Sequence, residues 1–150
     1  MHTRRRRALL VAASALYAFG LWWMTLRPEP YGAEAAGVLQ RVLAILAGWT
    51  GTAWVSFDVI EFTANVFMFV PLGLLVRAWG GRFRHAVLGG SVLSLAIETM
   101  QLLFLSSRVA DVRDVVADTA GAALGVGAAA LISRALRPHS ERIASAIESS

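Results

Sequence analysis

The sequence predicts an all-α membrane protein with four transmembrane helices and one additional helix on the outer face of the membrane. Three observations carry this prediction: 57% of the 150 residues are hydrophobic and only 16% are charged, uncharged apolar stretches recur along the chain, and the arginines lie between them. Soluble domains have about 25% charged residues. The chain has no cysteine, which excludes disulfides, thiolate metal sites and cysteine nucleophiles.

The first predicted span covers about residues 8–26, because 19 uncharged residues separate Arg7 from Arg27 and about 20 apolar residues cross a bilayer as a helix. A secretory signal peptide is the competing interpretation, since Ala33-Glu34-Ala35 resembles a cleavage site, but the apolar run is longer than the roughly 7–15 residues of such signals. Aromatic residues fit an interfacial belt near the far end of this span: Tyr17, Trp22 and Trp23.

Three further spans are predicted at about 62–79, 86–105 and 115–133. The last contains a stripe of small residues at intervals of four, which allows close approach of helix backbones in lipid: Gly121, Gly125 and Ala129. We therefore expect a four-helix bundle within a single polytopic membrane domain, residues 1–137, followed by a short cytoplasmic tail, residues 138–150, with an amphipathic turn or two.

The distribution of arginines sets the orientation, because cytoplasmic segments carry the excess of positive charge. With both termini inside, the inner segments hold 10 of the 14 arginines. A fifth span at 42–57 would move Arg82 and Arg84 outside. Residues 35–48 are therefore predicted to form an interfacial or re-entrant helix on the outer face.

Polar side chains fall at similar depths in three predicted spans. At about 1.5 Å per residue, Glu98 lies roughly 10 Å below the outer end of its helix, with Gln101 about one turn above it. Asn65 and Asp118 each lie roughly 6 Å inside their helices from the same side. Because an acidic residue near the centre of a span costs about 2.5–3.5 kcal/mol to insert, such residues normally face the bundle interior and have partners.

The acidic residues at the start of the last span have two interpretations. Asp111 fits a helix N-cap and Asp114 a first-turn acid, whereas Asp114 and Asp118, four residues apart, repel each other unless Arg108, Arg113, a cation or a proton neutralises them. A structural network of salt bridges and hydrogen bonds and a working ligand or catalytic site both remain open.

The ordered motifs of residues 58–131 resemble the VanZ-like family of bacterial membrane proteins. The resemblance rests on four segments: Glu61-x-x-x-Asn65, Phe69-Val70-Pro71-Leu72-Gly73, Ser94-x-x-x-Glu98-x-x-Gln101, and Arg108-x-x-Asp111-x-x-Asp114-x-x-x-Asp118-Thr119-x-Gly121-x-x-x-Gly125. It implies a multi-pass protein of the bacterial inner membrane, whose founding relative is linked to low-level resistance to glycopeptides, above all teicoplanin. The family usually has Asn where this chain has Asp118, which argues against an obligatory charged catalyst there.

Two functional hypotheses follow. In the first, a non-enzymatic envelope factor binds the head of a lipid or lipid-linked cell-wall precursor at an outward-facing polar cluster. In the second, an intramembrane enzyme modifies such a lipid, with Glu98 as general acid or base. The predicted ligand-binding residues are Glu61, Asn65, Glu98, Gln101, Arg108, Asp111, Asp114 and Asp118.

Other partners are less well supported. No cofactor is predicted, although oxygen ligands from Glu98, Asp114 and Asp118 could hold a divalent cation. Scattered histidines argue against a zinc site, and the topology accounts for the basic residues without a nucleic acid. A channel or proton path is disfavoured because the inner half lacks ionisable residues.

Overall fold

The computed structural model describes residues 2–26, 33–48, 52, 54–105 and 111–148, and within these ranges the chain is helical without strands. Four of the helices contain segments long and apolar enough to cross a membrane, at Thr3–Thr25, Phe57–Ala78, Phe83–Phe104 and Val112–Ala135. The predicted all-α fold with four spans is therefore confirmed. The helices are α1 (His2–Thr25), α2 (Ala33–Ala47), α3 (Phe57–Ala78), α4 (Phe83–Phe104) and α5 (Val112–Glu148).

The helices begin a few residues before the predicted spans. The prediction placed the start of the second span at residue 62, but α3 begins at Phe57, after Ser56, whose Oγ accepts a hydrogen bond from the Val59 N–H at 3.4 Å. Asp58 lies in the first turn, where the helix dipole favours a negative charge. A polar cap thus extends the helix beyond its apolar segment.

Close backbone packing joins α3 to α5, which form the most extensive helix–helix contact. A Cβ atom added at Gly121 would collide with the carbonyl oxygen of Val66, and one added at Gly125 would collide with that of Val70. The predicted role of the small-residue stripe is confirmed for these two glycines. Gly90 of α4 also packs against α5, where a Cβ atom added to it would lie 2.9 Å from Ala122 Cβ.

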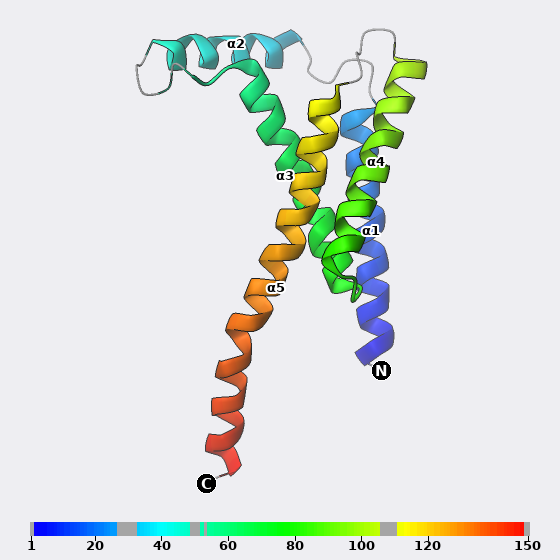
Figure 1. The fold of residues 1–150 in the computed structure, drawn as a ribbon, viewed down its shortest axis with the longest axis vertical. Coiled ribbons are helices and arrows are strands. Elements are labelled where there is room, and N and C mark those ends of the chain that lie inside the picture. The colour runs from blue at the N-terminus through cyan, green and yellow to red at the C-terminus, as the bar shows by residue number, and fades with distance from the viewer. Residues whose placement is uncertain (1, 27–32, 49–51, 53, 106–110, 149–150) are drawn as a thin grey trace.

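The two ends of the bundle differ in what they carry (Figure 1). The N-terminus and the turn between α3 and α4 lie at one end, where Gly80 has a φ of 87° that favours glycine. At the opposite end, called here the α2 end, α1 and α4 finish and α3 and α5 begin. Every polar residue of the predicted site that the structure describes belongs to the α2-end half of a helix or, for Asp111, directly precedes α5 at that end.

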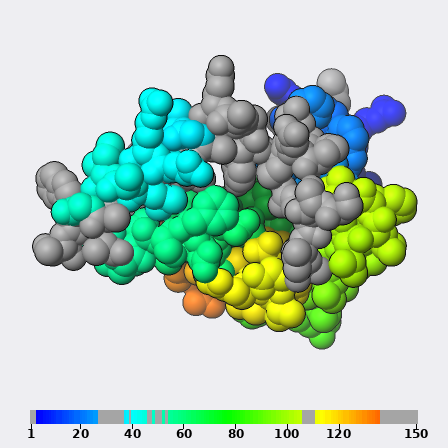
Figure 2. Space-filling view, turned by 90° about the horizontal axis from the view of Figure 1, so that it is seen from above, coloured from blue at the N-terminus to red at the C-terminus, as the bar shows by residue number. Residues whose placement is uncertain are grey.

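The short helix α2 lies across the bundle instead of along it (Figure 1). It is absent from the helices long and apolar enough to span a membrane, and in Figure 2 it lies on the side of the molecule opposite α4. This geometry agrees with the predicted interfacial helix at residues 35–48, with bounds of Ala33–Ala47.

The C-terminal segment is more helical than the sequence analysis expected. An amphipathic turn or two was predicted within residues 138–150, but α5 continues without a break from Val112 to Glu148. Five of the thirteen residues 138–150 are Ala, Arg or Glu, which have high helix propensity, although Ser is the commonest residue and Pro138 lies within the helix. Its cytoplasmic location stays a prediction.

Candidate functional site

The most deeply buried polar contact joins α4 to α5. Ser94 donates its hydroxyl proton to Oδ2 of Asp118 at 2.7 Å, and the two residues are 0% and 4% exposed. The other carboxyl oxygen of Asp118, Oδ1, is also buried and has no hydrogen-bond partner among the described residues. Asp118 therefore presents a buried acceptor that the surrounding helices leave unfilled.

A second contact links the end of α4 to the start of α5. Glu98, which is 8% exposed, accepts a hydrogen bond from the backbone N–H of Asp111 at its Oε2, 3.0 Å away. Asp111 in turn accepts at Oδ1 from the backbone N–H of Arg113 at 2.8 Å. The prediction that Asp111 is the N-cap is confirmed, and Asp114 lies in the first turn of α5, as predicted.

A third contact attaches α1 to this region. Gln101, which is 6% exposed, donates from Nε2 to the backbone oxygen of Thr25 at 2.8 Å. Thr25 is itself buried and uses its hydroxyl to bond the Leu21 carbonyl oxygen of its own helix. The three contacts together define the α2-end polar cluster, which consists of Thr25, Ser94, Glu98, Gln101, Asp111 and Asp118.

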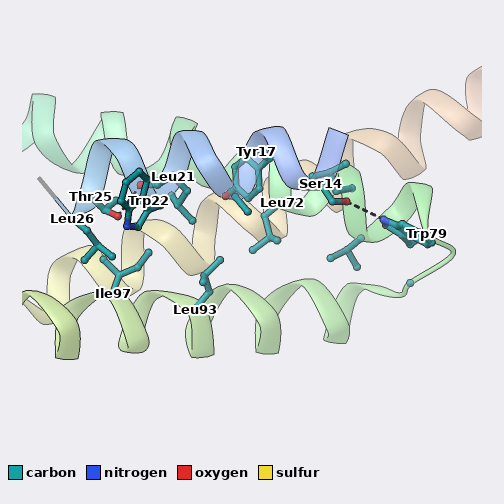
Figure 3. Close-up of a pocket in the computed structure, with 14 residues that line it drawn as sticks. Ser14, Tyr17, Leu21, Trp22, Thr25, Leu26, Leu72, Trp79, Leu93 and Ile97 are labelled. Carbon is teal, nitrogen blue, oxygen red and sulfur yellow. Dashed lines mark hydrogen bonds between the residues drawn. The ribbon is translucent and has the colours of Figure 1, made fainter. Parts of the chain in front are cut away.

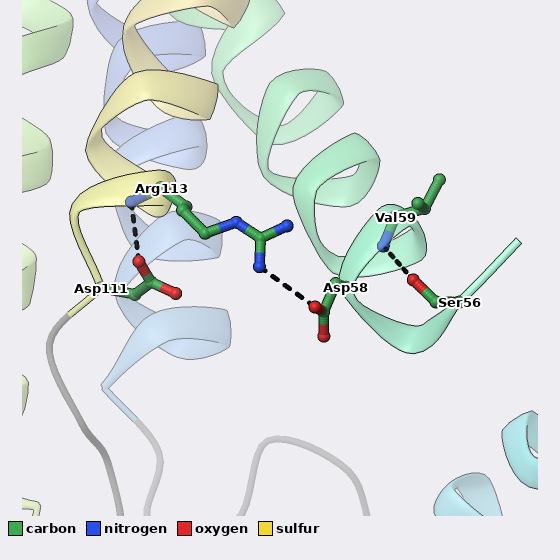
Figure 4. Close-up of polar contacts among 5 residues, drawn as sticks. All are labelled: Ser56, Asp58, Val59, Asp111 and Arg113. Carbon is green, nitrogen blue, oxygen red and sulfur yellow. Dashed lines mark hydrogen bonds and ion pairs between the residues drawn. The ribbon is translucent and has the colours of Figure 1, made fainter. Parts of the chain in front are cut away.

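An exposed ion pair lies at the mouth of the bundle (Figure 4). Arg113 Nη1 is 3.1 Å from Asp58 Oδ2, and the two side chains are 58% and 60% exposed. Arg113 was one predicted partner for Asp114 and Asp118, but its ion pair is with Asp58 of α3. The other predicted partner, Arg108, lies outside the described residues.

The remaining predicted residues lie apart from the buried contacts. Glu61 and Asn65 are half-buried on α3, and the neighbour of Asn65, Val66, packs against Gly121 of α5. This contact lies about one turn below Asp118 along α5. Asn65 makes no hydrogen bond through its side chain to another described residue. Its role as a ligand residue stays a prediction.

The sequence analysis missed Tyr17, which it assigned to an interfacial aromatic belt. Its hydroxyl is buried and has no hydrogen-bond partner among the described residues. Tyr17 lies at about the same depth in the bundle as Ser94. Thr25 and Gln101 are hydrogen-bonded and mark one level, and Tyr17 lies eight residues below Thr25 and Ser94 seven residues below Gln101, about 10–12 Å in each case. Burial of the hydroxyl, instead of exposure at the interface, corrects the assignment.

Ser94, Thr25 and Asp58 also contribute contacts that were not predicted. Ser94 lies one turn before Glu98 on the same face of a helix, and this spacing could have indicated its place in the site. The sequence did not indicate a role for Thr25, because this residue contributes its backbone oxygen, which every residue has. Contacts of that kind depend on tertiary packing.

The described residues contain no group of three or more His, Asp or Glu side chains placed to hold one metal ion. The hypothesis of a cation shared by Glu98, Asp114 and Asp118 therefore gains no support from the geometry. Chemically, the described part of the site offers hydrogen bonds: an acceptor at Asp118 and a donor or acceptor at Tyr17, both buried and both without a partner there.

Residues 14–133 match the model of the VanZ/LLP1 family. No curated protein and no solved structure matches the chain. The match spans the four candidate spans except the first turns of α1 and the end of the last span, so it includes the whole α2-end polar cluster.

Proposed function

The chain belongs to the VanZ/LLP1 family of membrane proteins, and on this premise we propose that it is a non-enzymatic factor of the bacterial cell envelope. Its function is to hold the polar head of a lipid or a lipid-linked cell-wall precursor at the α2-end polar cluster. The proposed orientation in the membrane has the α2 end facing outward and both termini in the cytoplasm, because the segments on the side of the termini carry most of the arginines.

The unfilled acceptor at Asp118 is the observation that carries the proposal. A buried acceptor without a donor costs about 1–3 kcal/mol, and more when it is charged. Asp118 Oδ1 has no such donor among the described residues, although Ser94 satisfies Oδ2 of the same carboxyl group. A ligand that supplies an O–H or N–H group at this position would remove the cost.

The residues around Asp118 favour a head group of mixed polarity. Hydroxyl groups of a sugar or glycerol, or an amine, can donate to the carboxyl oxygen. At the mouth, the guanidinium of Arg113 is more than half exposed and uses Nη1 for Asp58, so its other N–H groups can bind a phosphate. Lipid heads that combine phosphate with hydroxyl or amine groups meet both requirements.

The geometry gives less support to the alternative hypothesis of an enzyme with Glu98 as general acid or base. Glu98 Oε2 accepts the Asp111 N–H and so connects α4 to the start of α5. A carboxylate in this position stabilises the junction of two helices. A catalytic role would need Glu98 to exchange a proton while it keeps this connection.

Membership of the VanZ/LLP1 family suggests a biological role in tolerance of glycopeptide antibiotics, teicoplanin above all. Binding of a cell-wall precursor or of a lipid near it would change how much of the precursor these antibiotics reach. Expression of the chain in a susceptible bacterium tests this role by measuring the inhibitory concentration of teicoplanin with and without Asp118→Leu. Equal inhibitory concentrations with the parent chain and with an empty vector would contradict it.

Equilibrium binding of radiolabelled lipid II and of phosphatidylethanolamine to purified protein tests the binding activity itself. We expect Asp118→Leu, which removes the acceptor and keeps a side chain branched at Cγ, to weaken binding of the preferred lipid about tenfold or more. Asp118→Asn keeps an acceptor oxygen and should retain most of the affinity. A suitable control is Ser133→Ala, which changes a residue of α5 that bonds its own helix at Ala129.

The same pair of variants separates binding from catalysis. Replacement of Asp118 by a neutral amide would abolish activity as a general base, whereas the amide oxygen would still accept a hydrogen bond. Conversion of either lipid to a product that is lost in Asp118→Asn or Glu98→Gln would contradict the proposal and support the enzyme hypothesis.

A further inference from the structure

An apolar groove runs along α1 where this helix faces α3 and α4 (Figure 3). Its volume is about 570 Å³, within the roughly 300–1,000 Å³ of typical small-molecule sites. The side chains that line it come from all three helices and include Tyr17, Leu21, Leu72, Val76, Leu93 and Ile97.

The groove offers a mainly hydrocarbon surface. Of the polar side chains in its lining, Trp79 donates from Nε1 to Ser14 Oγ at 3.2 Å, and Thr25 bonds the Leu21 carbonyl oxygen at 2.8 Å. These groups are therefore satisfied within the protein. Among the buried polar side-chain atoms of the described lining, the Tyr17 hydroxyl lacks a hydrogen-bond partner. Such a surface does not attract water.

The groove follows part of α1, from its α2 end to the contact of Ser14 with Trp79, and its lining also includes Gly81 at the turn between α3 and α4. Its walls belong to helices long and apolar enough to span the bilayer, so it faces hydrocarbon. From Ser14 to Leu26 it follows twelve residue steps along the chain, about 18 Å.

The groove also leads into the polar cluster. At its α2 end lies Thr25, whose backbone oxygen accepts the hydrogen bond from Gln101. Ile97, one residue before Glu98, lines the groove. An amphiphile whose chain lay along α1 would therefore have its head near Thr25 and its hydrogen-bond partner Gln101.

We propose that the groove between α1, α3 and α4 binds one acyl chain of a membrane phospholipid whose head group lies at the α2-end polar cluster. The inference rests on the proposed function and narrows its ligand from any lipid to a phospholipid. The limited stretch of about 18 Å that the groove follows on α1 favours an acyl chain over the longer polyprenyl chain of cell-wall precursors.

Photocrosslinking of the full chain in nanodiscs tests the inference. The probe is phosphatidylethanolamine with a diazirine in its acyl chain, and mass spectrometry locates the adducts after illumination. Lipids that merely surround the protein label Val92 and Leu95, which are 66% and 54% exposed on α4. We expect labelling of Leu93 and Ile97 in the groove to exceed this background severalfold.

Variants that fill the groove provide the matched comparison. Leu93→Trp should reduce labelling of Ile97 severalfold, whereas Leu95→Trp, two residues away on the exposed face, should not change it. Ile97→Trp, read at Leu93, repeats the test if Leu93→Trp fails to fold. Groove labelling that does not exceed the background at Val92 and Leu95, or that the filling variants leave unchanged, would overturn the inference.

Two further comparisons identify the lipid chain that occupies the groove and separate this inference from the proposed function. Unlabelled phosphatidylethanolamine should compete for the groove, and displacement of the probe by undecaprenyl phosphate alone would overturn the acyl-chain assignment. If only the head-group proposal is wrong, groove labelling persists while lipid affinity does not depend on Asp118. If only the groove inference is wrong, Asp118→Leu weakens binding while groove labelling stays at background.

Discussion

The Nε2 atom of Gln101, near the end of α4, lies 2.8 Å from the backbone oxygen of Thr25, at the end of α1, and donates a hydrogen bond to it. At the other end of the bundle, Trp79 donates to Ser14 and Arg6 donates to the Ala78 carbonyl oxygen. Helix α1 is thus attached by polar contacts near both ends, with an apolar groove between them.

Replacement of Gln101 by leucine is expected to loosen the α2 end of α1. Hydrogen bonds between membrane helices contribute about 0.6 kcal/mol on average and up to about 1.7 kcal/mol, and the stability loss should lie in this range. The chain has no cysteine, so a single Leu21→Cys can report the change by its maleimide labelling rate. Labelling should accelerate in Gln101→Leu. Thr99→Val, which affects a bond within α4 only, is the control, and equal rates in both would refute the attachment.

Two replacements of Glu98 are expected to differ. Glu98→Gln keeps an oxygen that can accept the Asp111 N–H, so unfolding of the purified protein should change little. Glu98→Leu leaves this backbone donor without its acceptor and should cost about 1–3 kcal/mol. Unfolding in a denaturing detergent measures both. Equal losses would mean that the charge of Glu98, and not its hydrogen bond, stabilises the junction of α4 and α5.

Glycine-to-alanine changes should have opposite signs at two positions. Gly121→Ala places a methyl group against the Val66 carbonyl oxygen, and such overpacking typically costs about 1–3 kcal/mol. Gly89→Ala meets nothing within 4 Å and should stabilise its helix by about 0.5–1 kcal/mol. Thermal unfolding compares them. A stabilising Gly121→Ala would show that α3 and α5 are farther apart than described.

The fold was predictable because its signals are local. Length and hydrophobicity identified the four spans, and the arginines excluded a fifth. The bounds were less predictable, since Ser56 and Asp111 extend helices beyond their apolar segments. These polar caps interrupt the hydrophobic pattern, so a search for apolar runs stops short of them.

The site was predictable in part. Insertion cost singled out Glu98, Gln101 and Asp118, and all three are buried. Two of their partners were not predictable, because they are backbone groups, of Thr25 and Asp111. The third is the hydroxyl of Ser94, whose spacing from Glu98 indicates its face but not its partner. Spacing along a helix gives depth and face, but the choice of partner depends on how the helices pack.

The exposed ion pair at the mouth is expected to matter for binding and little for stability. Exposed pairs contribute about 0–1 kcal/mol, so Asp58→Asn should leave unfolding nearly unchanged. Arg113→Gln should weaken binding of phosphatidylethanolamine severalfold, because it removes a phosphate donor, whereas Asp58→Asn frees the guanidinium and should not weaken it. Equal affinities for the parent chain and Arg113→Gln would exclude Arg113 from the ligand site.

Infrared difference spectroscopy of the Asp118 carboxyl group tests the central claim most directly. Protein labelled with ¹³C-aspartate is compared in nanodiscs with and without phosphatidylethanolamine, and the band that Asp118→Asn removes is assigned to Asp118. We expect the lipid to shift this band, because its head group donates a new hydrogen bond to Oδ1. An Asp118 band that lipid II and phosphatidylethanolamine both leave unchanged would contradict the account.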